Sequence, residues 1–93
     1  LLAGFGRDNI RHVPFDAAFA LRPDALASMI ADDLAYGRRP CAVVVTTGST
    51  TTTALDPVSA VAEVARRHGL WLHVDAAMAG SAMVLPECRW MWE

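Results

Sequence analysis

The 93-residue chain contains no lysine. Its eight basic residues are all arginine, placed singly or in pairs, and the net charge is −2. No basic stripe forms that would bind the phosphate backbone of a nucleic acid. Without lysine there is also no phosphate-binding loop of the kind that ends in Gly-Lys-Ser/Thr.

Long apolar runs and closely spaced cysteines are missing as well. No stretch approaches the ~20 apolar residues that a membrane-spanning helix needs. Neither a nucleic acid nor a membrane is therefore expected as a partner. The two cysteines, Cys41 and Cys88, are too few and too far apart for a disulfide framework, which favours a reducing cytoplasm.

Apolar residues, by contrast, are abundant. They make up 54% of the chain, above the ~45–50% of an ordinary soluble domain, and a chain this short has little volume in which to bury them. Leu1–Gly6 resembles the tail of a helix that runs into a glycine stop. At the other end, Trp90–Glu93 does not predict a helix or strand that would complete a domain. The sequence predicts a partial domain over residues 1–93, truncated at both ends. A compact apolar mini-domain is the alternative.

The first half of the chain predicts a strand followed by a helix. Asp8–Pro14 indicates a turn that leads into a short strand, and Asp16–Arg22 indicates a connector. Pro23 suits the first position of a helix, which Gly37 and Pro40 would end. The apolar stripe of this helix comprises Leu26, Met29, Ile30 and Leu34.

The second half predicts a strand, a loop, a helix and a second strand. Cys41–Thr46 is a continuous apolar run rich in β-branched residues, which is typical of a parallel strand buried on both faces. A polar loop, Thr47–Leu55, follows. Asp56 and Pro57 suit the N-cap and first residue of a helix that ends at Gly69.

Leu70–Val74 is the second apolar strand, and Asp75 follows directly. Strand, helix and strand together predict an α/β fold with a parallel, right-handed βαβ unit. In such a unit the polar loop and Asp75 emerge at the same edge of the sheet. Ligands bind at this edge in open α/β sheets.

Asp75 is the strongest candidate for a binding residue. The run of small residues after it, Ala76–Ala82, leaves room for a flat ring to lie close. A carboxylate facing a pyridinium N–H gains a charge-assisted hydrogen bond of ~1.5–3 kcal/mol. It also keeps the ring protonated, and the protonated ring accepts electrons from a carbanion. The alternative is that Asp75 only caps the following turn.

Two further polar groups are candidates at this edge. His73 lies two residues before Asp75 and therefore on the same strand face. A metal site would need more ligands than are evident, so the alternative is a core histidine bonded to a neighbour. The hydroxyls of the loop and the Gly48 backbone suit an anionic group, although such loops are also ordinary polar turns.

Taken together, Thr47–Thr51, Leu55–Pro57 and Trp71–Ala82 resemble the group II pyridoxal-phosphate-dependent amino-acid decarboxylases. The Asp-Ala-Ala-x-Ala-Gly-Ser-Ala ending is most similar to the aromatic-L-amino-acid decarboxylase branch. The resemblance implies part of a fold type I large domain, as in aspartate aminotransferase, in a homodimer. It also implies a carboxy-lyase that converts an L-amino acid, aromatic in this branch, into its amine and CO₂.

The resemblance assigns roles to individual residues. Asp75 would partner the pyridine nitrogen of pyridoxal 5'-phosphate, Ala77 would pack on the ring face, and the Thr50 hydroxyl would contact cofactor or substrate. His73 and Asp56 match positions that support the site.

The chain departs from the family at two points. The family's Schiff-base lysine follows an Asn-Pro-His motif downstream of the matched region, so this chain alone contains no catalytic residue and is expected to be inactive. Met78 stands where the animal enzymes carry an aromatic residue, which leaves the substrate open. Alternatives are a part of an aminotransferase or carbon–sulfur lyase of the same fold, or a non-catalytic binding module.

Overall fold

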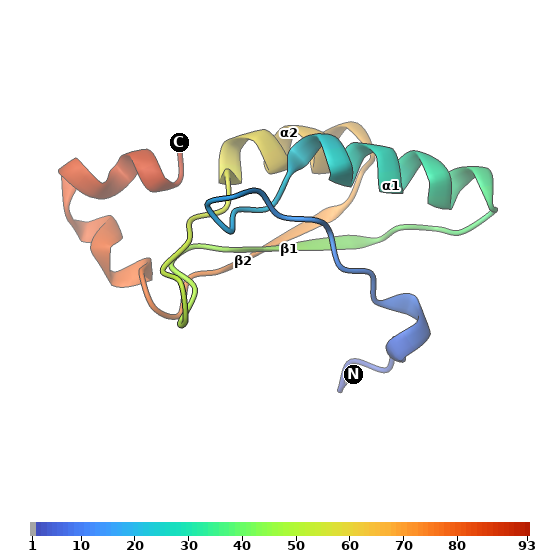
Figure 1. The fold of residues 1–93 in the computed structure, drawn as a ribbon, viewed down its shortest axis with the longest axis horizontal. Helices are drawn as coiled ribbons and strands as arrows, with labels where there is room; N and C mark the ends of the chain where they lie inside the picture. The colour runs from blue at the N-terminus through green and yellow to red at the C-terminus, as the bar shows by residue number, and fades with distance from the viewer. Residues whose placement is uncertain (1) are drawn as a thin grey trace.

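A computed structural model describes residues 2–93 as two helices lying on one side of a two-stranded parallel sheet (Figure 1). The helices are α1 (Pro23–Ala35) and α2 (Val58–Arg67), and the strands are β1 (Ala42–Thr46) and β2 (Trp71–Asp75). Three short 3₁₀ helices complete the described chain: η1 (Arg7–Asn9), η2 (Gly80–Val84) and η3 (Pro86–Met91). No helix within residues 2–93 has the length and apolarity to cross a membrane.

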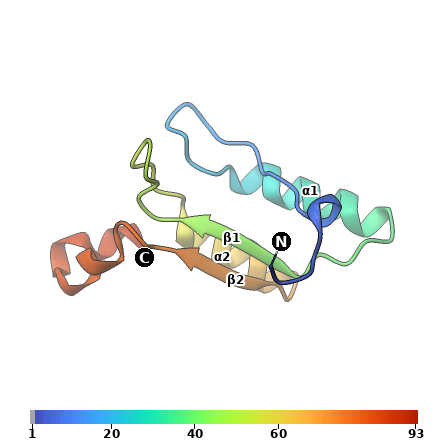
Figure 2. The ribbon, with the colours of Figure 1, turned by 90° about the horizontal axis from the view of Figure 1, so that it is seen from below.

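The βαβ unit predicted from the sequence is confirmed. Strands β1 and β2 pair in parallel, with Ala42 opposite Trp71 and Thr46 opposite Asp75. Helix α2 connects them and packs on the sheet, as Figure 2 shows from below. The carboxyl ends of both strands therefore lie side by side.

Helix α1 begins at Pro23, whose missing N–H costs nothing at a first helical position. Leu26 and Ile30 are buried, but Leu34 is 51% exposed, so the predicted apolar stripe is shorter than the sequence suggested. The helix ends at Ala35, and Gly37 follows with the positive φ of 74° expected after a helix end.

The core lies between the sheet and the two helices. Val45 of β1 and Val61 of α2 are both 0% exposed. The remaining buried apolar side chains come from both helices, from β1 and from the segment before α1: Leu21, Leu26, Ile30, Val43, Val58, Val64 and Ala65.

Burial along the strands alternates, which differs from the prediction of a strand buried on both faces. Val44 is 57% exposed and Trp71 is 73% exposed, while their neighbours point toward the helices. Both helices cover the same face, and within residues 2–93 no helix or strand covers the other. We call this uncovered side, made of Ala42, Val44, Thr46, Trp71, His73 and Asp75, the open face.

The N-terminal segment forms less regular structure than predicted. Asp8–Pro14 contains the end of η1 and extended chain but no strand, and within residues 2–93 no strand pairs with it. The predicted helix tail at Leu1–Gly6 is a turn over its described part, and Leu1 lies outside the described residues. A single antiparallel bridge, Phe15 to Leu21, closes a tight hairpin before α1.

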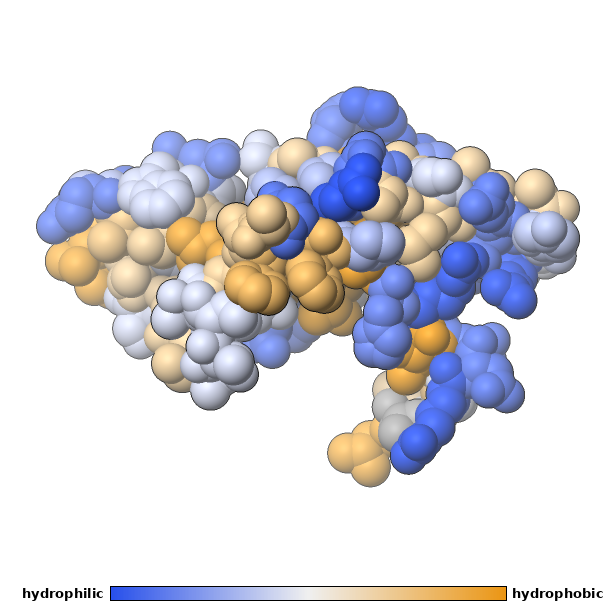
Figure 3. Space-filling model, viewed as in Figure 1, coloured by the Kyte–Doolittle hydropathy of each residue, from blue (hydrophilic) through white to orange (hydrophobic). Residues whose placement is uncertain are grey.

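Apolar side chains remain on the surface. The rings of Phe15 and Phe19 lie 5.6 Å apart on the hairpin, and both are exposed. Trp90 of η3 is exposed as well. Figure 3 shows apolar surface gathered near the middle of one side and again toward the C-terminal helices. The excess of apolar residues seen in the composition is thus not fully buried within this chain.

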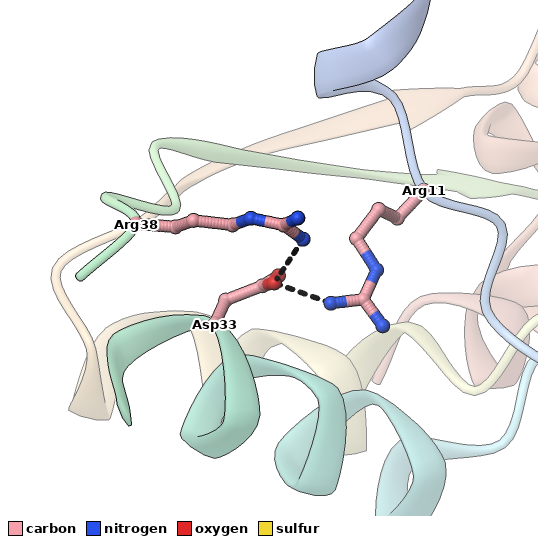
Figure 4. A network of polar contacts seen from close by, with 3 residues as sticks. All are labelled: Arg11, Asp33 and Arg38. Carbon is pink, nitrogen blue, oxygen red and sulfur yellow. Dashed lines mark hydrogen bonds and ion pairs between the residues drawn. The ribbon is translucent and has the colours of Figure 1, made fainter. Parts of the chain in front are cut away.

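An ion-pair network joins the N-terminal segment to the end of α1 (Figure 4). Asp33 accepts hydrogen bonds from Arg11 and, at 3.1 Å, from Arg38. Burial by itself raises the pKa of Asp33, but the hydrogen bonds from the two arginines outweigh it, so the pKa lies below its ordinary value. The arginines also offset an unfavourable carboxylate at a helix C-terminus.

Candidate functional site

Asp75 stands at the carboxyl end of β2, as the sequence predicted, and its register with Thr46 places it on the open face. Its backbone carbonyl accepts a hydrogen bond of 2.9 Å from the Thr47 N–H, the first residue after β1. The start of the polar loop and Asp75 therefore meet at one edge of the sheet, as the βαβ topology predicted.

The Asp75 carboxylate has one engaged oxygen. Its Oδ1 accepts a hydrogen bond of 3.2 Å from the Ala77 N–H, which forms the turn cap considered as the alternative role. Within residues 2–93, Oδ2 has no hydrogen-bond partner, and the residue is exposed. Capping and ligand binding are therefore compatible, because the turn holds the carboxylate in place and leaves one oxygen to accept from a ligand.

His73 shares the open face with Asp75 and lies opposite Val44 across the strand pair. Its side chain is exposed, so the alternative of a buried core histidine is wrong for this chain. Ala77 is exposed directly beyond Asp75, and its methyl group leaves the edge accessible. Within the described part of the chain, no group of three His, Cys, Asp or Glu side chains could hold a metal ion.

The polar loop is held by its own hydrogen bonds. Ser49 Oγ lies 2.6 Å from Thr52 Oγ1, and the Thr53 hydroxyl donates to the Thr52 carbonyl at 2.7 Å. Thr53 takes a φ of 55°, which is strained for a β-branched residue. Of the loop threonines in the described chain, the hydroxyls of Thr50 and Thr51 have no such bond and are exposed. The Thr50 hydroxyl is thus free within the described chain, and its contact with cofactor or substrate stays a prediction.

Small residues join the loop to the segment after β2. A Cβ placed on Gly48 would lie 2.8 Å from the Ala79 Cβ, closer than side-chain carbons approach. Gly48 also has a φ of 75°, which residues with a side chain rarely adopt. One of the small residues after Asp75 therefore has a packing role, because Ala79 lies directly against the loop.

Asp56 has a different role from the predicted helix cap. The N-cap position of α2 is Pro57, and no side chain caps the helix. The Asp56 carboxylate instead accepts 2.7 Å and 2.8 Å hydrogen bonds from the backbone N–H groups of Leu21 and Thr46. The sequence could not indicate this role, since Leu21 lies 35 residues away in the chain.

Thr47 is a feature that sequence reasoning missed. It is 0% exposed, and its hydroxyl has no partner among the described residues. The period of two offered a signal, because Thr47 continues the inward-facing positions of Val43 and Val45. Thr47 therefore belongs to the helix-covered side, whereas the site lies on the open face.

Hollows occur at two places on the described chain. One of about 640 Å³ lies between the start of α2 and η3, and one of about 970 Å³ lies between the N-terminal segment, α1 and β1. Neither is lined by Asp75, His73, Ala77 or Thr50. In this chain the candidate site is an open sheet edge rather than an enclosed pocket.

Known proteins are similar to this chain in sequence. Aromatic-L-amino-acid decarboxylase of Catharanthus roseus is 46% identical over 90 residues, covering 95% of this chain and 18% of the relative. Phenylacetaldehyde synthase of a Rosa hybrid cultivar is 42% identical over 90 residues, with 95% and 18% covered. The chain thus spans less than a fifth of the length of these relatives.

A solved structure matches as well. Oryza sativa TDC with PLP and tryptamine superposes with a TM-score of 0.91 at 46% identity, covering 97% of this chain and 19% of that one. The family model described as the pyridoxal-dependent decarboxylase conserved domain matches residues 2–93. The α/β fold with its parallel βαβ unit is therefore the fold of this part of a pyridoxal-phosphate decarboxylase. By sequence and by structure, the chain belongs to the pyridoxal-dependent decarboxylase family.

Proposed function

We propose that the protein containing this chain is a carboxy-lyase that converts an aromatic L-amino acid into its amine and CO₂ with pyridoxal 5'-phosphate. Residues 1–93, a partial large domain of fold type I, contribute the part of the site that holds the cofactor ring. One observation carries this proposal. Asp75 presents a free carboxylate oxygen at the exposed carboxyl end of β2, held in place by its bond from Ala77 N–H.

The residues present suit the cofactor. Asp75 has an acceptor oxygen for a pyridinium N–H. Ala77 is small and exposed beside it, so that a flat ring meets no bulky side chain. When bound, the cofactor supplies an electron-accepting ring. Asp75 holds the proton on the ring nitrogen, and its charge stabilises the protonated form.

Thr50 and His73 complete this side of the proposed site. The free Thr50 hydroxyl, on a loop anchored at Asp75, contacts the cofactor or substrate. His73 shares the face of Asp75 and supports the same ring. The lysine that links the cofactor is supplied from outside these 93 residues, since the chain contains none. The isolated chain is therefore proposed to be inactive.

The relatives support the substrate class. One of them is an aromatic-L-amino-acid decarboxylase, and the rice structure holds tryptamine, an amine. A homodimer in the cytoplasm is part of the same proposal, and it rests on the family resemblance and on the sparse cysteines.

A product assay tests the function. The full-length protein, loaded with pyridoxal 5'-phosphate, is incubated with L-tryptophan, L-tyrosine or L-phenylalanine, and every product is quantified. We expect an amine and CO₂ in equal amounts. An aldehyde would instead match the activity named for the rose relative, and a keto acid would indicate transamination. Either product in place of the amine would contradict the proposal.

A further inference from the structure

The geometry points to Asp56 as a positioning residue, which fixes the Thr50 loop against the sheet edge that carries Asp75. This inference rests on the proposed function, since it concerns the same cofactor site. Asp56 itself does not touch the ligand, and it acts through the backbone of the elements that it joins.

Asp56 binds three backbone groups in two separate elements. Its two carboxylate oxygens accept from Leu21 N–H at 2.7 Å and Thr46 N–H at 2.8 Å. Its own N–H donates to the Thr46 carbonyl at 3.0 Å. Thr46 and Asp56 are therefore joined in both directions, and the carboxylate also ties in the hairpin before α1.

These bonds close the loop at its base. The loop runs from Thr47 to Leu55. Those two residues form an antiparallel bridge, which is next along the chain to the Thr46–Asp56 pair. Further along, Gly48 N–H and Ser49 N–H both donate to the Ala54 carbonyl. The loop conformation that leaves Thr50 free thus depends on the pairing of Thr46 with Asp56, the residues that flank the loop.

The same base reaches the candidate site. Thr46 is the register partner of Asp75, and Thr47 N–H donates to the Asp75 carbonyl. Asp56 is therefore separated from Asp75 only by the last residue of β1. Movement of Thr46 would change the position of both the loop and the strand end.

A carboxylate is the side chain that this position requires. Both oxygens face N–H donors, so each must accept. In Asp56→Asn the amide nitrogen can only donate, and it would face one of the two N–H groups. One backbone donor would then lose its partner in a partly buried place, which is costly.

The experiment compares Asp56→Asn with Asp33→Asn in the full-length protein. Asp33→Asn is the matched control, because it also changes a carboxylate that joins two segments but lies away from the loop. Amide hydrogen exchange of the apo protein and the dissociation constant for pyridoxal 5'-phosphate are measured for each. In Asp56→Asn we expect Gly48, Ser49 and Thr53 to exchange at least about tenfold faster and the dissociation constant to rise about tenfold. Asp33→Asn should change neither.

Unchanged exchange in Asp56→Asn, or faster exchange with unchanged cofactor affinity, would overturn the inference. Should Asp56→Asn fail to fold, Asp56→Glu provides the same comparison, since it keeps both oxygens but displaces them by one methylene. Failure of the wild-type protein to bind the cofactor would overturn the proposed function instead. The exchange comparison alone would then decide whether Asp56 positions the loop.

Discussion

The two faces of the sheet carry different kinds of residue, although they alternate along the same ten strand positions. The helix-covered face presents Val43, Val45, Leu72 and Val74, and Val45 is fully buried. The open face presents Thr46, His73 and Asp75 beside exposed Val44 and Trp71. The covered face provides stability, and the open face carries every strand residue that we assign to the site.

This difference shows how a short parallel pair separates folding from chemistry. A carboxylate on the covered face would have to lose water without a partner, which is costly. On the open face Asp75 remains exposed and needs only one turn bond to hold it. Substitution of Asp75 should therefore affect catalysis, whereas substitution of a core side chain such as Val45 should affect stability.

The largest effect is expected from Asp75→Ala on the open face of the full-length protein. Removal of a preorganised charge at a reacting site typically lowers kcat about 10²–10³-fold. Thermal unfolding of the apo protein should change little, because within residues 2–93 the side chain makes a single bond, to Ala77 N–H. Decarboxylation rates and melting curves of both proteins test this. Near-normal turnover would contradict the assignment of Asp75.

Gly48→Ala tests the contact that joins the loop to the segment after Asp75. The new methyl group would lie 2.8 Å from the Ala79 Cβ, and φ would stay near 75°. We expect the free energy of unfolding to fall by about 2–4 kcal/mol, from the strained φ and the overpacking together.

The double variant with Ala79→Gly provides the control for this prediction. It removes the close contact but not the strained φ, so it should recover only part of the loss. Full recovery would show that the φ of Gly48 costs nothing, and no recovery would show that the contact with Ala79 is unimportant. Chemical denaturation measures all three proteins.

Val45→Ala and Val44→Ala compare the two faces directly. Val45→Ala should lower the free energy of unfolding by about 2 kcal/mol, from two lost methylene equivalents and the cavity left behind. In the full-length protein we expect a similar cost for Val44→Ala, because an uninterrupted apolar run is typical of a strand covered on both sides. A change within about 0.5 kcal/mol, as for surface substitutions, would show that the open face is also open in the whole protein.

The smallest effect is expected from Asp33→Asn, in the last turn of α1. Because its folded-state pKa is lowered by Arg11 and Arg38, the Asp33 carboxylate stabilises the fold above its unfolded pKa of about 3.9. That contribution is lost as the pH falls through the folded pKa. The wild type should therefore lose more stability than Asp33→Asn between pH 6 and pH 2.5 in denaturation experiments. Parallel curves would contradict a role for this network.

The sequence predicted most of the fold because the signals were local. Pro23 marked the start of α1, Gly37 and Gly69 followed the ends of the two helices, and the apolar runs marked β1 and β2. The meeting of the polar loop with Asp75 followed from the βαβ topology alone. Local pattern and topology were sufficient for these elements.

The errors have a common physical cause, which is that they depend on partners distant in the sequence. Asp56 matched an N-cap pattern locally, but its oxygens bind Leu21 and Thr46. The predicted strand at Asp8–Pro14 has no strand to pair with among the residues that the structure describes. The exposure of Val44 and Leu34 likewise depends on which other elements cover them. The apolar pattern within one strand or helix does not predict those neighbours.

The role that we propose for Asp75 is to hold a proton on the cofactor's ring nitrogen. Nuclear magnetic resonance of pyridoxal 5'-phosphate labelled with ¹⁵N in the ring, bound to the full-length protein at neutral pH, measures this directly. We expect a protonated ring nitrogen in the wild type and an unprotonated one in Asp75→Asn. The same protonation state in both proteins would contradict the account.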